Sequence, residues 1–245
     1  MRISPTRTPR SALLTAVLAA VVTVAALVVV VVLRPKPDGA PGVPPVSLEP
    51  AAPTTATCGS GACRQLAAMT VGGTPVVLLS DASGGWGRVQ VGPQPGTEFE
   101  LAITTMGAKL TAESLRCIAG ETSACLVTGD VGGGDGAGGA FGELLVGSGG
   151  VWRDFGKPYF ADAGTLSLFD VDTDGRPDVI VVRHECPDAT PGTPKCQAAP
   201  VLAEVYQLDG TELGCTKKVA SPSDLRGWPQ VEVRASELRP CADGG

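Results

Sequence analysis

Residues 166–182 read LSLFDVDTDGRPDVIVV, and this stretch decides how the rest of the chain is interpreted. Four aspartates lie within nine residues at its centre: Asp170, Asp172, Asp174 and Asp178. Gly175 supplies a permissive backbone where a chain turning around an ion needs one. The flanking residues 166–169 and 179–182 are mostly apolar and β-branched, which is typical of strands. We therefore predict a calcium loop that joins two strands.

A weak internal repeat extends this pattern to other parts of the chain. Shifted by 102 residues, the stretch 66–79 aligns with 168–181, and the Gly-x-Pro of the loop recurs without the aspartates. Shifted by 53 residues, the stretch 115–128 aligns with the same segment. Each copy is expected to form a strand-loop-strand hairpin.

The middle copy carries cysteines where the loop carries aspartates. Cys117 takes the position of Asp170, and Cys125 takes that of Asp178. The first and last ligands of a loop that holds one ion must approach each other, so cysteines at these positions would lie near disulfide distance. We predict a Cys117–Cys125 disulfide across a hairpin equivalent to the calcium hairpin.

A further strand is expected after each hairpin, at residues 86–91, 141–146 and 201–208. Residues 228–233 resemble the first of these strands and are expected to begin or close a fourth unit. The spacing of about 50 to 60 residues per unit is the length of a propeller blade. The predicted fold is all-β, with propeller-like repeats of short antiparallel strands. Three to four units would form a complete or an incomplete ring, preceded by one transmembrane helix.

The chain before this domain has the composition of a membrane anchor and a stalk. Residues 1–10 carry three arginines, and residues 11–33 are uncharged over 23 positions, long enough to span a bilayer. This run is longer than a signal-peptide core of about 7 to 15 residues, so an uncleaved signal anchor is favoured over a cleaved signal peptide. The positive charge before it predicts a cytoplasmic N-terminus. Residues 34–57 contain seven prolines and are expected to form a stalk.

Residues 58–245 are thus expected to fold outside the cytoplasm, attached to the cell membrane by one helix. This part has 14 Lys and Arg against 23 Asp and Glu, a net charge of −9 (14 − 23). Nucleic-acid binding depends on clustered basic residues, so this function is disfavoured. Abundant Ala, Val, Gly and Arg with scarce Lys are typical of a GC-rich bacterial genome. With the predicted anchor, the expected location is a bacterial envelope.

All eight cysteines follow the stalk: Cys58, Cys63, Cys117, Cys125, Cys186, Cys196, Cys215 and Cys241. An even number of cysteines outside the cytoplasm predicts four disulfides, and sequence alone leaves 105 pairings open. We favour the pairing of neighbours along the chain. A zinc site is disfavoured, because the chain has no CxxC motif and a single histidine, His184.

The loop DVDTDGRPD resembles the DxDxDGxxD loop of FG-GAP and VCBS repeats, which are known from integrin-type β-propellers. The resemblance implies that the four aspartates bind a structural Ca²⁺ with side-chain oxygens and that Arg176 adds its backbone carbonyl. The chain departs from the pattern of this family in two ways. Only one of the three units keeps the aspartates, and about three and a half blades fit where the family usually has seven. An EF-hand begins with the same residues but needs a twelfth-position Glu, which is Val181 here. The other alternative is an acidic turn without metal, which leaves four repelling carboxylates unless protons or a cation offset them.

These patterns favour a binding or interaction module with an unidentified protein or cell-wall carbohydrate ligand. One alternative is an envelope hydrolase that acts on wall polysaccharide or peptide. Another is a non-catalytic regulatory ectodomain of a membrane complex. No GxSxG motif is present, and His184-Glu185 is expected to be structural. The sequence leaves enzymatic activity open, favours a non-catalytic role and assigns no catalytic residue.

Overall fold

The computed structural model describes residues 57–132, 138–186, 190 and 193–241. The predicted anchor at residues 11–33 and residues 34–56 of the predicted stalk lie outside this part. No helix within the described residues is long and apolar enough to cross a membrane.

The described chain consists mainly of short strands. In chain order the strands are β1 (Thr57–Cys58), β2 (Gly61–Ala62), β3 (Arg64–Val71), β4 (Thr74–Ser80), β5 (Gly87–Val91), β6 (Thr97–Glu100), β7 (Leu115–Ile118), β8 (Thr122–Val131), β9 (Gly139–Ser148), β10 (Val151–Asp154), β11 (Tyr159–Ala161), β12 (Thr165–Phe169), β13 (Asp178–His184), β14 (Val201–Tyr206) and β15 (Glu212–Cys215). The helices are α2 (Ala102–Thr105) and α3 (Pro194–Gln197), with single 3-10 turns at Pro222–Asp224 and Ala235–Glu237.

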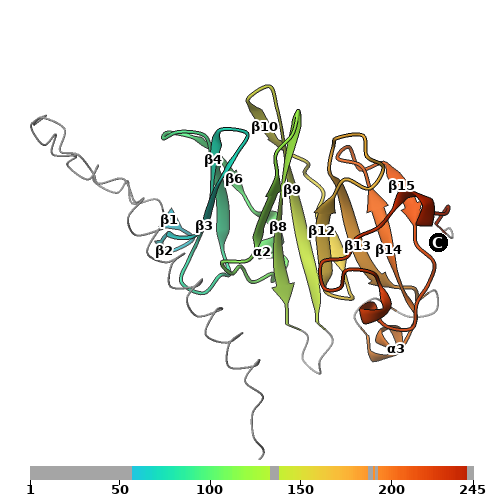
Figure 1. Cartoon of the computed structure of the whole chain (residues 1–245). Helices are drawn as coiled ribbons and strands as arrows, with labels where there is room; N and C mark the ends of the chain where they lie inside the picture. The colour runs from blue at the N-terminus through green and yellow to red at the C-terminus, as the bar shows by residue number, and fades with distance from the viewer. Residues whose placement is uncertain (1–56, 133–137, 187–189, 191–192, 242–245) are drawn as a thin grey trace, which may run out of the picture. The chain divides into compact units, whose positions relative to one another are not determined.

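After a two-stranded sheet of β1 and β2, three larger antiparallel sheets follow one another along the chain (Figure 1). The first sheet has the order β3-β4-β5-β6, the second β7-β8-β9-β10 and the third β12-β13-β14-β15, so each is a meander of consecutive strands. Strand β11 also pairs with β9, beyond the end of β10. The two short strands β10 and β11 therefore form this edge of the second sheet together. The all-β prediction is confirmed, and the strands expected at residues 86–91, 141–146 and 201–208 are found in β5, β9 and β14.

The first hairpin shows how local sequence determines this pattern. Val71 pairs with Thr74, which leaves Gly72 and Gly73 as a two-residue turn with φ angles of 55° and 83°. Positive φ at both positions matches the type I′ turn that connects twisted antiparallel strands, and glycine adopts it without steric cost. In β4 the buried residues Val76 and Leu78 alternate with partly exposed ones, as expected for a strand with one face in the core.

Apolar residues from adjacent sheets meet in two cores. The core between the first and second sheets includes Val76, Leu78, Val89, Cys125, Val127 and Leu145. The core between the second and third sheets includes Ala124, Leu144, Val146, Val179 and Val181. The second sheet is therefore buried on both faces, which explains the nearly continuous apolar run of β9.

The outer face of the third sheet is covered by the C-terminal segment, residues 222–241. Its Leu225, Val231 and Val233 pack against Ile180 and Val205 of the sheet. The strand and the fourth unit predicted at residues 228–233 are not formed, and no strand follows β15 in the described chain. The backbone N–H of Glu232 donates to the Arg226 carbonyl at 3.0 Å instead of pairing with a strand. The alternating valines of this segment reflect burial rather than strand pairing.

Four disulfides join neighbours along the chain, which confirms the predicted pairing: Cys58–Cys63, Cys117–Cys125, Cys186–Cys196 and Cys215–Cys241. Cys117 and Cys125 lie directly opposite each other in β7 and β8, with a Cα–Cα distance of 4.0 Å. The middle hairpin is therefore closed by a disulfide, as predicted.

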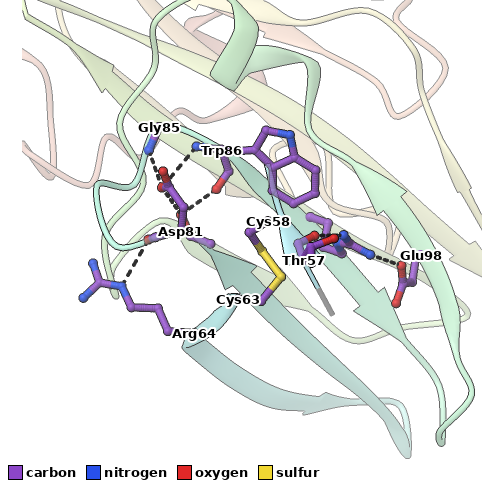
Figure 2. Close-up of a disulfide and its surroundings, with 10 residues drawn as sticks. Thr57, Cys58, Cys63, Arg64, Asp81, Gly85, Trp86 and Glu98 are labelled. Atoms are coloured by element: carbon purple, nitrogen blue, oxygen red, sulfur yellow. Dashed lines mark hydrogen bonds and ion pairs between the residues drawn. A yellow bond between two sulfur atoms is a disulfide. The ribbon is translucent and has the colours of Figure 1, made fainter. Parts of the chain in front are cut away.

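The first disulfide fastens the start of the described chain to the first sheet (Figure 2). Thr57, which was expected to end the stalk, already belongs to β1, and its carbonyl accepts a hydrogen bond from the Arg88 guanidinium. The same guanidinium pairs with Glu98 and lies over the Trp86 ring, 4.8 Å from its centroid. Asp81 accepts backbone N–H bonds from Gly85 and Trp86 and so orders the adjacent β4–β5 loop.

Candidate metal centre

The aspartate-rich loop is held by the hairpin of β12 and β13. Phe169 and Asp178 form the last residue pair, and residues 170–177 connect them. Val171 points into the core under the C-terminal segment and anchors the start of the loop. Thr173 and Gly175 have positive φ angles of 63° and 83°. This backbone costs a β-branched threonine of order 1–3 kcal/mol, so the rest of the loop imposes a conformation that Thr173 does not favour.

Backbone N–H groups orient three of the carboxylates. Gly175 donates to Asp170 Oδ2 at 3.1 Å, and Asp174 donates to Asp172 Oδ1 at 3.2 Å. Arg176 donates to Asp174 Oδ1 at 2.7 Å. These bonds bend the loop back on itself and turn its carboxylates inward.

Three of the four predicted aspartates converge. Asp170, Asp172 and Asp174 each offer one oxygen, and these oxygens lie within 4.8 Å of one another. Oxygens around one Ca²⁺ lie at 2.3–2.6 Å from the ion, so two of them are separated by at most about 5 Å. Asp170 Oδ1 is also buried and has no hydrogen-bond partner among the described residues. The spacing and this unpaired oxygen fit a hard cation with oxygen ligands.

Asp178 lies at the base of the hairpin rather than in the converging group. Its side chain is buried, and Oδ2 accepts the Val171 N–H at 3.0 Å. Burial, together with the negative charges of Asp172, Asp174 and Asp170, raises the pKa of Asp178 to about 6, against the lowering effect of the Val171 N–H bond. The loop thus carries repelling negative charge that a bound cation would offset.

Arg176 directs its side chain away from the aspartates. Its guanidinium donates to Thr122 Oγ1 of the second sheet at 3.4 Å. Hydrogen bonds from Thr211 lower the pKa of Asp209, and the charge of Arg176 adds to this shift. The predicted role of its backbone carbonyl as a metal ligand stays a prediction.

The loop lies against the corresponding turn of the second sheet. A Cβ atom at Gly120, in the β7–β8 turn, would be 3.3 Å from the Gly175 carbonyl oxygen. In the same way, a Cβ atom at Gly72 in the β3–β4 turn would be 3.6 Å from Ser123 Oγ. The first hairpin turns of the three sheets therefore lie side by side, and the loop is placed at a junction between sheets.

A buried acid that the sequence patterns did not single out lies in the second sheet. Glu143 of β9 has an exposed fraction of 2%, and its Oε2 accepts the Ile103 N–H at 3.2 Å. Burial raises the pKa of Glu143 to about 7, and Asp154 contributes in the same direction. The one signal in the sequence is a charged residue inside the apolar stretch FGELLV.

Fold and loop geometry together define an antiparallel all-β domain, closed by disulfides, with a candidate site for a divalent cation. Comparisons with protein-family models, with curated proteins and with solved structures found no match to this chain.

Proposed function

We propose that the chain is a binding or interaction module of a bacterial envelope, held in the membrane by residues 11–33, with a structural Ca²⁺ in the loop 170–178. Two observations carry the calcium proposal: the convergence of oxygens from Asp170, Asp172 and Asp174, and the buried, unpaired Oδ1 of Asp170. The uncharged run of residues 11–33 supports the membrane anchor.

We further propose that the three sheets are blades of an incomplete propeller related to the FG-GAP and VCBS repeats. Two features support this arrangement. Each sheet contains a meander of four consecutive strands, to which the second sheet adds β11, and the turns of their first hairpins are neighbours in space. The second sheet packs on both sides against another sheet, as an inner blade would.

The proposed Ca²⁺ stabilises the fold and takes no part in catalysis. The loop touches the β7–β8 turn through Gly175 and the Arg176 side chain, so a bound ion would fix the junction of two sheets. A hydrolase needs an acid that the substrate can reach. Glu143 has a pKa suited to that chemistry, but with 2% of its surface exposed it cannot contact a wall polymer.

Incubation of the full chain in detergent micelles with purified cell-wall polysaccharide tests the binding role. We expect the protein to sediment with the polymer without releasing soluble fragments or new reducing ends. Release of such fragments by the wild-type chain would instead establish a hydrolase. Sedimentation equal to that of an unrelated micelle-bound protein would rule out wall binding, and crosslinking in intact membranes would then test the regulatory alternative.

A further inference from the structure

A second group of side chains of metal-binding types lies at the end of the β12–β13 hairpin that is away from the loop 170–178. Asp162 follows β11, His184 ends β13, Cys186 lies two residues later, and Cys196 belongs to α3. Asp162 Oδ1 accepts the backbone N–H of His184 at 2.7 Å, which fixes the carboxylate beside the histidine ring. These four residues come from three separate segments of the chain, so no local sequence motif predicts the group.

The histidine and the aspartate are buried and face each other. The side chains of His184 and Asp162 are 10% and 3% exposed, and His184 Nδ1 lies 3.4 Å from Asp162 Oδ1. This nitrogen is buried and has no hydrogen-bond partner among the described residues. An imidazole nitrogen without a partner, held inside the fold next to a carboxylate, has the position of a metal ligand.

Both sulfurs are near the same carboxylate. Cys196 Sγ lies 3.3 Å from Asp162 Oδ2, and Asp162, Cys186 and Cys196 offer ligand atoms within 4.8 Å of one another. Nitrogen and oxygen ligands of a tetrahedral zinc ion are separated by about 3.4 Å, because each lies about 2.1 Å from the metal. The distance between His184 Nδ1 and Asp162 Oδ1 has this value. The neighbouring Glu185 is paired with Lys218 and is not needed as a ligand.

We propose that Asp162, His184, Cys186 and Cys196 form a Zn²⁺ site when the Cys186–Cys196 disulfide is reduced. Two thiolates on one zinc ion are about 3.8 Å apart, whereas bonded sulfurs are about 2.0 Å apart, so the disulfide and the metal exclude each other. The oxidised chain holds the disulfide, and the reduced chain holds the metal. Soft thiolates with an imidazole select zinc over calcium, which distinguishes this site from the loop 170–178.

A dithiol reductant gives two electrons and two protons to the Cys186–Cys196 bond and becomes a disulfide itself, leaving two thiols. Zn²⁺ then displaces one proton from each thiol and binds both thiolates together with the Asp162 carboxylate and neutral His184. Reoxidation of the two thiolates by a disulfide reverses these steps and releases the ion.

Cobalt absorption of the full chain in detergent micelles tests the site without a reductant. A Cys186→Ser variant frees Cys196 and leaves the other three disulfides closed. We expect this variant to bind one Co²⁺ per chain with a thiolate-to-cobalt charge-transfer band, and we expect Zn²⁺ to remove the band. Adding His184→Ala should weaken Co²⁺ binding at least about tenfold. The matched control Cys241→Ser frees Cys215 beside Glu204, a cluster with no histidine in contact, and should give no comparable band.

Two results would overturn the proposal. One is a folded Cys186→Ser variant, as judged by circular dichroism, that gives no charge-transfer band. The other is an equal Co²⁺ affinity with and without His184→Ala. Should Cys186→Ser not fold, the wild-type chain reduced with a phosphine provides the same reading with both thiolates present. Co²⁺ binding that is at least about tenfold weaker on adding His184→Ala then supports the site, and an unchanged affinity contradicts it.

Discussion

Replacing Cys215 and Cys241 together with alanine is expected to lower the free energy of unfolding by about 3.5 kcal/mol. The disulfide closes a loop with a sequence separation of 26. Crosslinking a loop of this length lowers the conformational entropy of the unfolded chain, which stabilises the folded state by about 3.5 kcal/mol at 25 °C. It also fastens the C-terminal segment, whose Leu225, Val231 and Val233 cover the outer face of the third sheet. Apart from the disulfide, the backbone bonds between Cys215 and Arg239 hold this end of the segment.

Urea unfolding under oxidising conditions measures this effect. The matched control replaces Cys117 and Cys125, whose separation of 8 predicts a smaller loss of about 2.5 kcal/mol. Those two residues also remain neighbours in the β7–β8 ladder without the bond. A greater loss from the Cys117–Cys125 pair than from the Cys215–Cys241 pair would show that the C-terminal segment does not depend on its disulfide.

Glu143→Gln is expected to stabilise the protein by about 3 kcal/mol at pH 8 and to have little effect at pH 4.5. Burial and then Asp154 raise the pKa of Glu143 from 4.5 to about 7 in the folded state, so the folded protein keeps a proton that the unfolded chain releases. Stability is therefore full below pH 4.5 and falls as the pH rises to about 7, by about 1.4 kcal/mol for each unit of pKa difference. Glutamine resembles the protonated acid and does not ionise.

Free energies of unfolding in urea at pH 4.5 and pH 8 check this prediction. The control Glu100→Gln changes an exposed carboxylate of β6 and should give the same small difference at both pH values. A stability gain for Glu143→Gln that does not change with pH would mean that Glu143 is ionised inside the fold or that its surroundings admit water.

Much of the fold follows from local sequence. Alternating apolar residues in β4 and β5 predict strands, the Gly72-Gly73 pair predicts a tight hairpin turn, and the alignment of Cys117 with Asp170 predicts a closed hairpin. Each of these features depends on residues close together in the chain, where backbone geometry leaves few choices.

Long-range packing determines the features of the fold that local sequence patterns do not predict. Residues 228–233 have the alternation of a strand, but the open face of the third sheet takes up their valines as a covering layer. Asp178 follows the spacing of a metal ligand, yet its position opposite Phe169 gives its carboxylate to the Val171 N–H. Asp162, which follows β11, and Cys196 of α3 lie together near Cys186, and only the folded chain brings them together.

Thermal unfolding of the full chain with and without calcium tests whether the loop 170–178 binds Ca²⁺. At a Ca²⁺ concentration 100 times the dissociation constant, the ion should add about 2.7 kcal/mol and raise the melting temperature by about 5–10 °C over the value in excess chelator. Asp170→Ala should abolish this shift, whereas Asp130→Ala, at an exposed aspartate outside the loop, should keep it. A melting temperature that millimolar calcium does not change in the wild-type chain would contradict a calcium loop at residues 170–178.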